Sequence, residues 1–185
     1  TQLNPAEIAL CAERGVSVVH CPQSNMKLAS GFCPADALLK AGVNLAIGTD
    51  GCASNNDLDM FDELRTAALL AKAVAQDATA FKAFSALHSA TLAGARAMGL
   101  EDRIGSLEAG KQADIIAVDL SQLETLPIYD VISQLVYAGS RQQVSDVWIA
   151  GRIKMQDRQL VDIDIQKIQA TARRWQHTIK RIQSP

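Results

Sequence analysis

The clearest candidate for chemistry is a carboxylate between glycines, Asp50 in the stretch Gly48-Thr49-Asp50-Gly51. The apolar residues 43–47 directly before it predict a buried strand. In α/β folds, ligands bind and catalysis takes place at the carboxyl ends of such strands. Asp50 could hold a divalent metal through one oxygen and accept a proton from water through the other, and the glycines would let a metal or substrate approach the backbone closely. The alternative is an aspartate that caps its own turn.

His20 follows the preceding predicted strand, residues 16–19, in the same way that Asp50 follows residues 43–47. If the two strands are neighbours in a parallel sheet, both side chains lie at one rim of that sheet. His20 could then bind a metal, hydrogen-bond a substrate or orient a water molecule. The alternative is that backbone groups of the long loop predicted at residues 20–33 satisfy its ring nitrogens.

A count of metal ligands limits what these residues can do alone. A catalytic zinc site needs about three protein ligands, and the predicted rim offers Asp50 and His20, with no His-x-His and no HExxH pattern in the sequence. His88 falls in a predicted helix and fits a packing or surface position, while His177 lies in a basic terminal helix and fits a solvated one. The sequence therefore does not supply a complete hydrolytic metal centre.

Helices and short apolar strands alternate over residues 1–98, and these elements would position the two candidate residues. Asn4, Pro5 and Glu7 form the pattern of a helix start with a capping box, and Gly15 ends that helix. The other elements predicted here are helices at residues 35–40, 58–75 and 79–98, the last broken near residues 88–89, and the strands at residues 16–19 and 43–47. Short apolar strands between helices indicate a parallel sheet covered by helices.

The pattern changes after about residue 105, where the chain becomes rich in turns and strands. The predicted elements are strands at residues 113–120, 144–150 and 152–156, the last two as a hairpin about Gly151, a helix at residues 129–137, and a polar helix from about residue 164. Two parallel strands or three short antiparallel strands rarely form a stable sheet alone. Because the sequence also does not begin with Met, we expect either a removed start or a piece of a longer protein.

Composition excludes several classes of function. The chain has 185 residues, of which 48% are hydrophobic and 21% charged, with a formal net charge of -2. This near-neutral balance predicts no nucleic-acid partner, and no apolar run approaches the roughly 18 residues needed to cross a membrane. The four cysteines form no CxxC pair. Free thiols and the lack of a signal peptide predict a reducing compartment, the cytoplasm.

Three longer motifs occur in order along the chain. They read His20-Cys21-Pro22-x-Ser24-Asn25-x-Lys27-Leu28-x-Ser30-Gly31, Gly48-Thr49-Asp50-Gly51-x-x-Ser54-Asn55-Asn56, and Ala90-Thr91-x-x-Gly94-Ala95-x-Ala97-x-Gly99 running into Ile104-Gly105-Ser106-Leu107-Glu108-x-Gly110-Lys111-x-Ala113-Asp114. Together they resemble the C-terminal part of the metal-dependent amidohydrolase superfamily, in particular its branch of 5-methylthioadenosine/S-adenosylhomocysteine deaminases, guanine deaminases and s-triazine hydrolases. There they correspond to the loop after barrel strand seven, the metal loop after strand eight, and the passage from barrel to β-sandwich.

The resemblance implies an α/β fold, namely the C-terminal part of a distorted (β/α)₈ barrel with part of a small β-sandwich and a closing C-terminal helix. On this basis residues 1–110 would be the last βα units of the barrel, residues 111–161 part of the β-sandwich, and residues 162–185 a helix that packs back on the barrel. The rest of the same protein would precede this chain, and the family implies a homo-oligomer.

The resemblance also implies one divalent metal, most often zinc, held by a His-x-His after strand one, a histidine after strand five and an aspartate after strand eight. In this sequence only that aspartate has a counterpart, Asp50, which would hold the metal and move a proton from water to the leaving ammonia. His20 and Asn25 would organise the site or contact substrate, and Ser54 would face the pocket.

The implied activity of the whole protein is hydrolytic deamination of an adenine nucleoside, a small-molecule substrate, while residues 1–185 alone would be inactive. One alternative is another enzyme of the branch, a guanine deaminase or a chlorohydrolase. A second, of another class, is a non-catalytic module that binds a partner chain. In a third, the N-terminal half is a separate or clipped chain that reassociates with this one.

Overall fold

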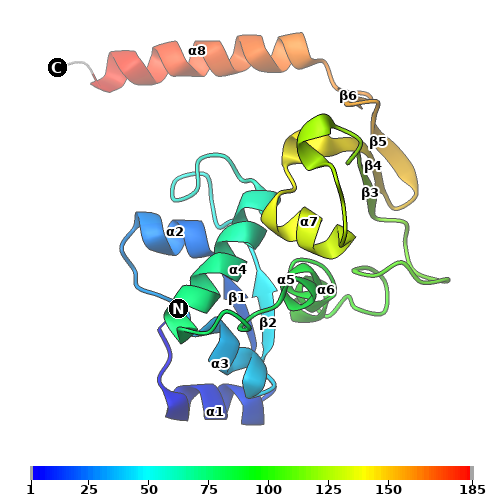
Figure 1. The fold of residues 1–185 in the computed structure, drawn as a ribbon. Helices are drawn as coiled ribbons and strands as arrows, with labels where there is room; N and C mark the ends of the chain where they lie inside the picture. The colour runs from blue at the N-terminus through cyan, green and yellow to red at the C-terminus, as the bar shows by residue number, and fades with distance from the viewer. Residues whose placement is uncertain (1, 184–185) are drawn as a thin grey trace.

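A computed structural model describes residues 2–183, which contain two sheets and a set of helices (Figure 1). The N-terminal part contains α1 (Pro5–Glu13), β1 (Ser17–His20), α2 (Pro22–Lys27), α3 (Ala35–Lys40), β2 (Asn44–Ile47), α4 (Met60–Ala75), α5 (Ala83–Ser89) and α6 (Leu92–Ala97). The C-terminal part contains β3 (Ile115–Val118), the 3₁₀ helix η1 (Leu123–Thr125), α7 (Val131–Tyr137), the 3₁₀ helix η2 (Arg141–Gln143), β4 (Val144–Ile149), β5 (Arg152–Gln156), β6 (Gln159–Leu160) and α8 (Ile165–Gln183). The predicted α/β class is confirmed.

The start of α1 follows from its capping residues. The backbone amide of Glu7 donates to the Asn4 side chain at 3.0 Å, and the backbone amide of Asn4 donates to the Glu7 carboxylate at 2.7 Å. These two bonds satisfy amides that have no partner inside the helix. Together with Pro5 in the first turn, they confirm the predicted capping box.

The strands β1 and β2 are parallel neighbours, as predicted, with His20 opposite Ile47 at their carboxyl ends. Figure 1 shows this sheet beside α3, α4, α5 and α6. The core lies between the sheet and these helices and includes the fully buried side chains of Leu38, Leu45 and Ala67. Both strands therefore direct their carboxyl ends to one rim, where the candidate residues lie.

The long loop predicted at residues 20–33 is wrong in part, because residues 22–27 form the helix α2. Pro22 occupies the first helical position, where its missing N–H costs nothing. The amide of Asn25 then donates to the Cys21 carbonyl at 3.0 Å, and that of Leu28 to the Ser24 carbonyl. The helix is too short to show a helical period in the sequence. It nevertheless sets the direction of the Ser24 side chain.

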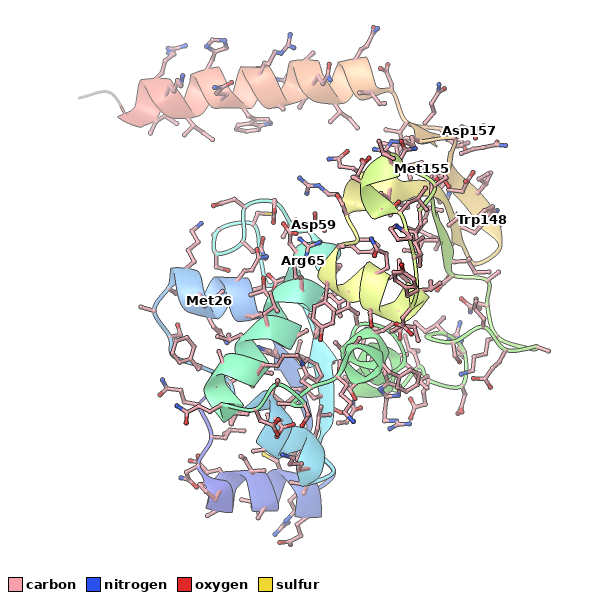
Figure 2. All side chains as sticks on the ribbon, in the orientation of Figure 1. Met26, Asp59, Arg65, Trp148, Met155 and Asp157 are labelled. Carbon is pink, nitrogen blue, oxygen red and sulfur yellow. The ribbon has the colours of Figure 1, made fainter. Side chains whose placement is uncertain are left out.

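The predicted helix over residues 79–98 is two helices, α5 and α6, separated at Ala90 and Thr91. The predicted break is thus confirmed, two residues beyond the place expected. Helix α4 packs against α7, and the Arg65 guanidinium ties them by donating to the Tyr137 carbonyl at 2.9 Å (Figure 2). This hydrogen bond holds the N-terminal half of α4, which follows the loop after β2, against α7.

The antiparallel sheet has the order β3-β4-β5-β6, one strand more than predicted. The hairpin β4–β5 about Gly151 is confirmed. The missed strand, β6, is two residues long and follows a turn in which Asp157 and Arg158 both have positive φ. Such turns usually carry Asn-Gly or Asp-Gly, so Asp-Arg gave no turn signal.

Helix α8 lies apart from the sheets and the other helices (Figure 1). Its exposed apolar side chains include Ile168, Trp175 and Ile179. It makes no extended contact with another element of the described chain, so its packing on a barrel stays a prediction about a longer protein.

None of the described helices combines the length and apolar character needed to cross a membrane. The four cysteines are free thiols.

Candidate functional site

Two hydroxyl groups from different segments meet on the carboxylate of Asp50. Asp50 follows β2 after Gly48 and Thr49, and its φ of 63° lies in the left-handed region, which aspartate tolerates better than most residues. Ser24 on α2 and Ser54 in the same loop as Asp50 each donate to Asp50 Oδ2 at 2.7 Å. Among the described residues, no side chain donates to Oδ1, so that oxygen can face a ligand.

These hydrogen bonds favour the ionised form of the Asp50 carboxyl. The hydroxyl of Ser24, followed by that of Ser54 and the backbone amide of Gly51, holds the pKa of the Asp50 carboxyl below its usual value. Because Ser24 lies on α2, 26 residues before Asp50, the carboxylate does more than cap its own turn. The arrangement presents an ionised, oriented carboxylate at the carboxyl end of a strand, which suits a hard or borderline divalent cation.

The two glycines near Asp50, Gly48 and Gly51, differ in how closely other atoms surround them. A Cβ at Gly48 would lie 3.1 Å from Val19 Cγ1, so the Val19 side chain would have to shift by a few tenths of an ångström to admit a larger residue. A Cβ at Gly51 would meet no atom within 4 Å. Gly48 is therefore more closely packed than Gly51, and the open space at Gly51 leaves room for a ligand to approach the backbone.

His20 lies at the rim predicted for it, but its side chain points elsewhere. Alternation along β1 buries Val18 and His20 on one face and exposes Val19 on the other. Burial lowers the pKa of His20 to about 4, so the imidazole is neutral, and its Nδ1 has no hydrogen-bond partner among the described residues. The alternative, in which backbone groups of the loop satisfy the ring nitrogens, is not formed at Nδ1 within the described chain. The His20 carbonyl accepts from the Gly48 amide at 3.0 Å.

Of the remaining predicted site residues, Ser54 is joined to Asp50 and Asn25 is not. Ser54 donates to Asp50 Oδ2 and also lies 3.3 Å from the Gly51 carbonyl. Asn25 is half-buried on α2, and its side chain makes no hydrogen bond within residues 2–183. The structure therefore brings together Asp50 and Ser54 from the predicted set.

A second layer of polar contacts lies behind the serines and was not predicted. The buried carboxylate of Glu63 on α4 accepts from the Asn55 side-chain amide through Oε1 and from the Gln23 backbone amide through Oε2, the latter at 3.3 Å. Burial raises the pKa of Glu63 to about 7. Asn55 in turn accepts the Leu58 amide at 3.1 Å, which shapes the loop after β2.

Two signals could have identified these missed residues. The dipeptide Ser-Asn occurs at Ser24-Asn25 and again at Ser54-Asn55, and both serines bind Asp50. Glu63 is four residues before Ala67, on the buried stripe of α4. An acidic residue on a buried stripe needs hydrogen-bond donors nearby.

Asp50 lies in no group of three or more possible metal ligands among the described residues. The group of that kind found there is Asp57, Asp59 and Asp62. Arginines already contact two of its members, Arg141 at 3.5 Å from Asp59 and Arg65 at 3.3 Å from Asp62. Asp59 also caps α4 by accepting the Phe61 amide. This group is therefore explained by helix capping and ion pairs.

Comparisons with known proteins identify the family of this chain. Residues 1–154 match the family model described as the amidohydrolase family. A crystal structure of an adenosine deaminase from Xanthomonas campestris with bound zinc is 67% identical, with a TM-score of 0.96, over 97% of this chain and 41% of that one. An atrazine chlorohydrolase from Arthrobacter aurescens, complexed with zinc, is 28% identical with a TM-score of 0.84, over 92% of this chain and 38% of that one.

Among curated sequences, the 5-methylthioadenosine/S-adenosylhomocysteine deaminase of Teredinibacter turnerae is 51% identical over 179 residues. The match covers 97% of this chain and 40% of that protein. The chain thus spans about two fifths of the length of the relatives that it matches.

Proposed function

Because this chain belongs to the amidohydrolase family, we propose that it forms part of a metal-dependent aminohydrolase that deaminates an adenine nucleoside. The substrates proposed are 5-methylthioadenosine and S-adenosylhomocysteine, which the curated relatives name. The observation that carries the proposal is the carboxylate of Asp50, held at the carboxyl end of β2 by Ser24 and Ser54. The high identity to a zinc-bound adenosine deaminase supports it.

The proposed reaction is hydrolysis of a carbon–nitrogen bond. The oxygen of water bonds to the ring carbon that carries the amino group, the bond from that carbon to nitrogen breaks, and ammonia leaves, which converts adenine to hypoxanthine. When bound, a divalent metal such as Zn²⁺ lowers the pKa of water and so supplies a nucleophile at neutral pH. Asp50 is proposed to hold that metal, to receive a proton from the attacking water and to pass it to the leaving nitrogen.

The neighbours of Asp50 have supporting roles in this proposal. The hydroxyls of Ser24 and Ser54 keep the carboxylate ionised and fix its plane. His20, whose side chain is buried on the face of β1 opposite Val19, is proposed to organise the rim. Asn25 is proposed to organise the rim or to contact substrate, since it does not bond to Asp50. A neutral imidazole at His20 suits such a role better than that of a charged acid.

The remaining parts of the site are proposed to lie in the rest of a longer protein. Residues 1–110 would then complete an eight-stranded barrel, residues 111–161 a β-sandwich, and residues 162–185 would pack on the barrel through the apolar face of α8. The exposed Val19 on the open face of β1 and the exposed Trp175 on α8 support this assignment. A cytoplasmic homo-oligomer belongs to the same proposal.

Assay of the full-length protein against a panel of substrates tests the function. We expect ammonia release from 5-methylthioadenosine, S-adenosylhomocysteine and adenosine, with kcat/KM at least about 100-fold higher than for guanine or a chlorotriazine, because a site that hydrogen-bonds its substrate rejects analogues strongly. Liquid chromatography of the products gives the readout. Guanine deamination or chloride release as the dominant activity would replace this proposal by the corresponding alternative.

The two serines should matter unequally. Ser24 is 2% exposed, whereas Ser54 is half-buried, so water can replace the hydroxyl of Ser54 but not that of Ser24. In the full-length protein we expect Ser24→Ala to weaken zinc binding and lower kcat about 10- to 100-fold, and Ser54→Ala only a few-fold. Chelator competition and steady-state kinetics measure both, with Ser85→Ala as the control. Equal effects, or none, would contradict this role.

A further inference from the structure

The carboxylate of Glu63 joins the two segments that carry the serines. Its Oε2 accepts the backbone amide of Gln23, the residue before Ser24, at 3.3 Å. Its Oε1 accepts the side-chain amide of Asn55, the residue after Ser54. Glu63 itself is fully buried near the start of α4. One carboxylate therefore links α2 to the loop after β2, directly behind the point where both segments reach Asp50.

We propose that Glu63 is a positioning residue, whose buried carboxylate holds α2 and the loop after β2 in the register that places both serine hydroxyls on Asp50. This rests on the proposed role of Asp50. Glu63 makes no contact with Asp50 or with the reacting atoms, and it acts through Ser24 and Ser54. A further bond supports the same register, since the side-chain amide of Gln23 donates to Thr66 Oγ1 on α4 at 3.3 Å.

The chemistry at this position requires an acceptor on both sides. The two partners of Glu63 are both N–H donors, and no ion pair of Glu63 is formed within residues 2–183. The charged groups that act on it, Asp57 and Asp62, are acidic and disfavour its ionised form, as burial does. A carboxylate satisfies two converging donors, whereas a glutamine would turn its own NH₂ toward one of them. These two hydrogen bonds favour the charged form, but burial outweighs them, and the pKa of Glu63 stays raised at about 7.

The first variant is Glu63→Gln in the full-length protein. We expect a 10- to 100-fold weaker zinc affinity and a similar fall in kcat, with KM changed little, because Asp50 loses its alignment while the rest of the pocket is intact. Zinc affinity is read by chelator competition and kcat by ammonia release. The matched control is Glu124→Gln, an exposed glutamate without a side-chain bond in the described chain, which should match the wild type.

The double variant N55D/E63Q exchanges donor and acceptor across the contact. The glutamine introduced at position 63 can still accept the Gln23 amide through its oxygen, and its NH₂ can donate to the new aspartate. That aspartate can also accept the Leu58 amide, as Asn55 does. We expect the double variant to recover at least about half of the lost affinity on a logarithmic scale, while N55D alone, with two carboxylates facing each other, stays impaired.

The outcomes separate this inference from the proposed function. If Glu63→Gln keeps wild-type zinc affinity and kcat while Asp50→Asn loses both, the positioning role is wrong and the proposed function stands. If Asp50→Asn also keeps both, the proposed function itself fails. If Glu63→Gln lowers the thermal melting temperature and the double variant restores the melting temperature but not zinc affinity, Glu63 supports the fold alone and the inference is overturned.

Discussion

Asp50→Asn in the full-length protein should reduce deaminase kcat by at least about 1000-fold, the loss expected when several kcal/mol of transition-state stabilisation disappear. The amide has the size of the carboxylate but lacks the charge that holds a metal and the basicity that accepts a proton. Zinc content after dialysis should fall in parallel. Activity assays and metal analysis on the same preparation measure the two effects together.

Asparagine is the right substitute because it should leave the fold in place. It tolerates the left-handed backbone at position 50 as aspartate does, whereas alanine would add strain at a φ of 63°. The hydroxyls of Ser24 and Ser54 can also act as acceptors, so they can turn to receive the new NH₂. The melting temperature of the metal-free protein should therefore change little. Asp102→Asn, at an exposed aspartate, is the control. Full activity in Asp50→Asn would refute the role given to this residue.

A local pattern predicted Asp50, and the resemblance to the family added Ser54 from the same loop. Asp50 and Ser54 are four residues apart, so the turn that follows β2 brings them together without help from distant segments. The parallel pairing of β1 with β2 followed from apolar strands separated by a helix. The capping box at Asn4 was equally local. The bond between Ser54 and Asp50 and the capping box at Asn4 each join residues three or four positions apart. The pairing of β1 with β2 follows from the order of the elements along the chain.

Contacts that depend on the orientation of a neighbouring element were missed. The bond from Ser24 to Asp50 requires α2, which the sequence suggested was a loop. The bond from Gln23 to Glu63 joins residues 40 apart and requires α4 to lie beside α2. No local pattern encodes these distances, because they follow from tertiary packing. The buried stripe of α4 gave the sole sequence hint of Glu63.

His20 shows how a correct position can still mislead. Both βα units end at one rim, as predicted, and yet strand alternation turns His20 to the face of Val18. Val19 is 51% exposed, so alternation along the strand places the side chain of His20 on the opposite, buried face. The sequence does not set this parity, because Val18 and Val19 are both valine. The position of His20 at the end of a strand predicted that it lies at the rim. The alternation of side chains along the strand decided which face of the sheet its side chain occupies.

Residues 1–185 produced alone should show no deaminase activity and a zinc affinity at least about four orders of magnitude below that of the full-length protein. Zinc binding to the complete structural sites of zinc-finger peptides is worth roughly 10–16 kcal/mol, and one carboxylate supplies a small share of such a binding free energy. Asp50 has no two further ligands near it in the described chain, and the group formed by Asp57, Asp59 and Asp62 is engaged in capping and ion pairs. Chelator competition and ammonia release on equal molar amounts provide the comparison.

Adding back the rest of the protein as a second polypeptide makes this test decisive. The open face of β1 with Val19 and the apolar side of α8 with Trp175 are surfaces that a partner segment can cover. Reassociation should then restore zinc binding and activity together, and it should fail when this chain carries Asp50→Asn. Deamination by residues 1–185 alone would instead mean that this chain contains a whole catalytic centre, and the role of Asp50 as one ligand of a larger set would have to be abandoned.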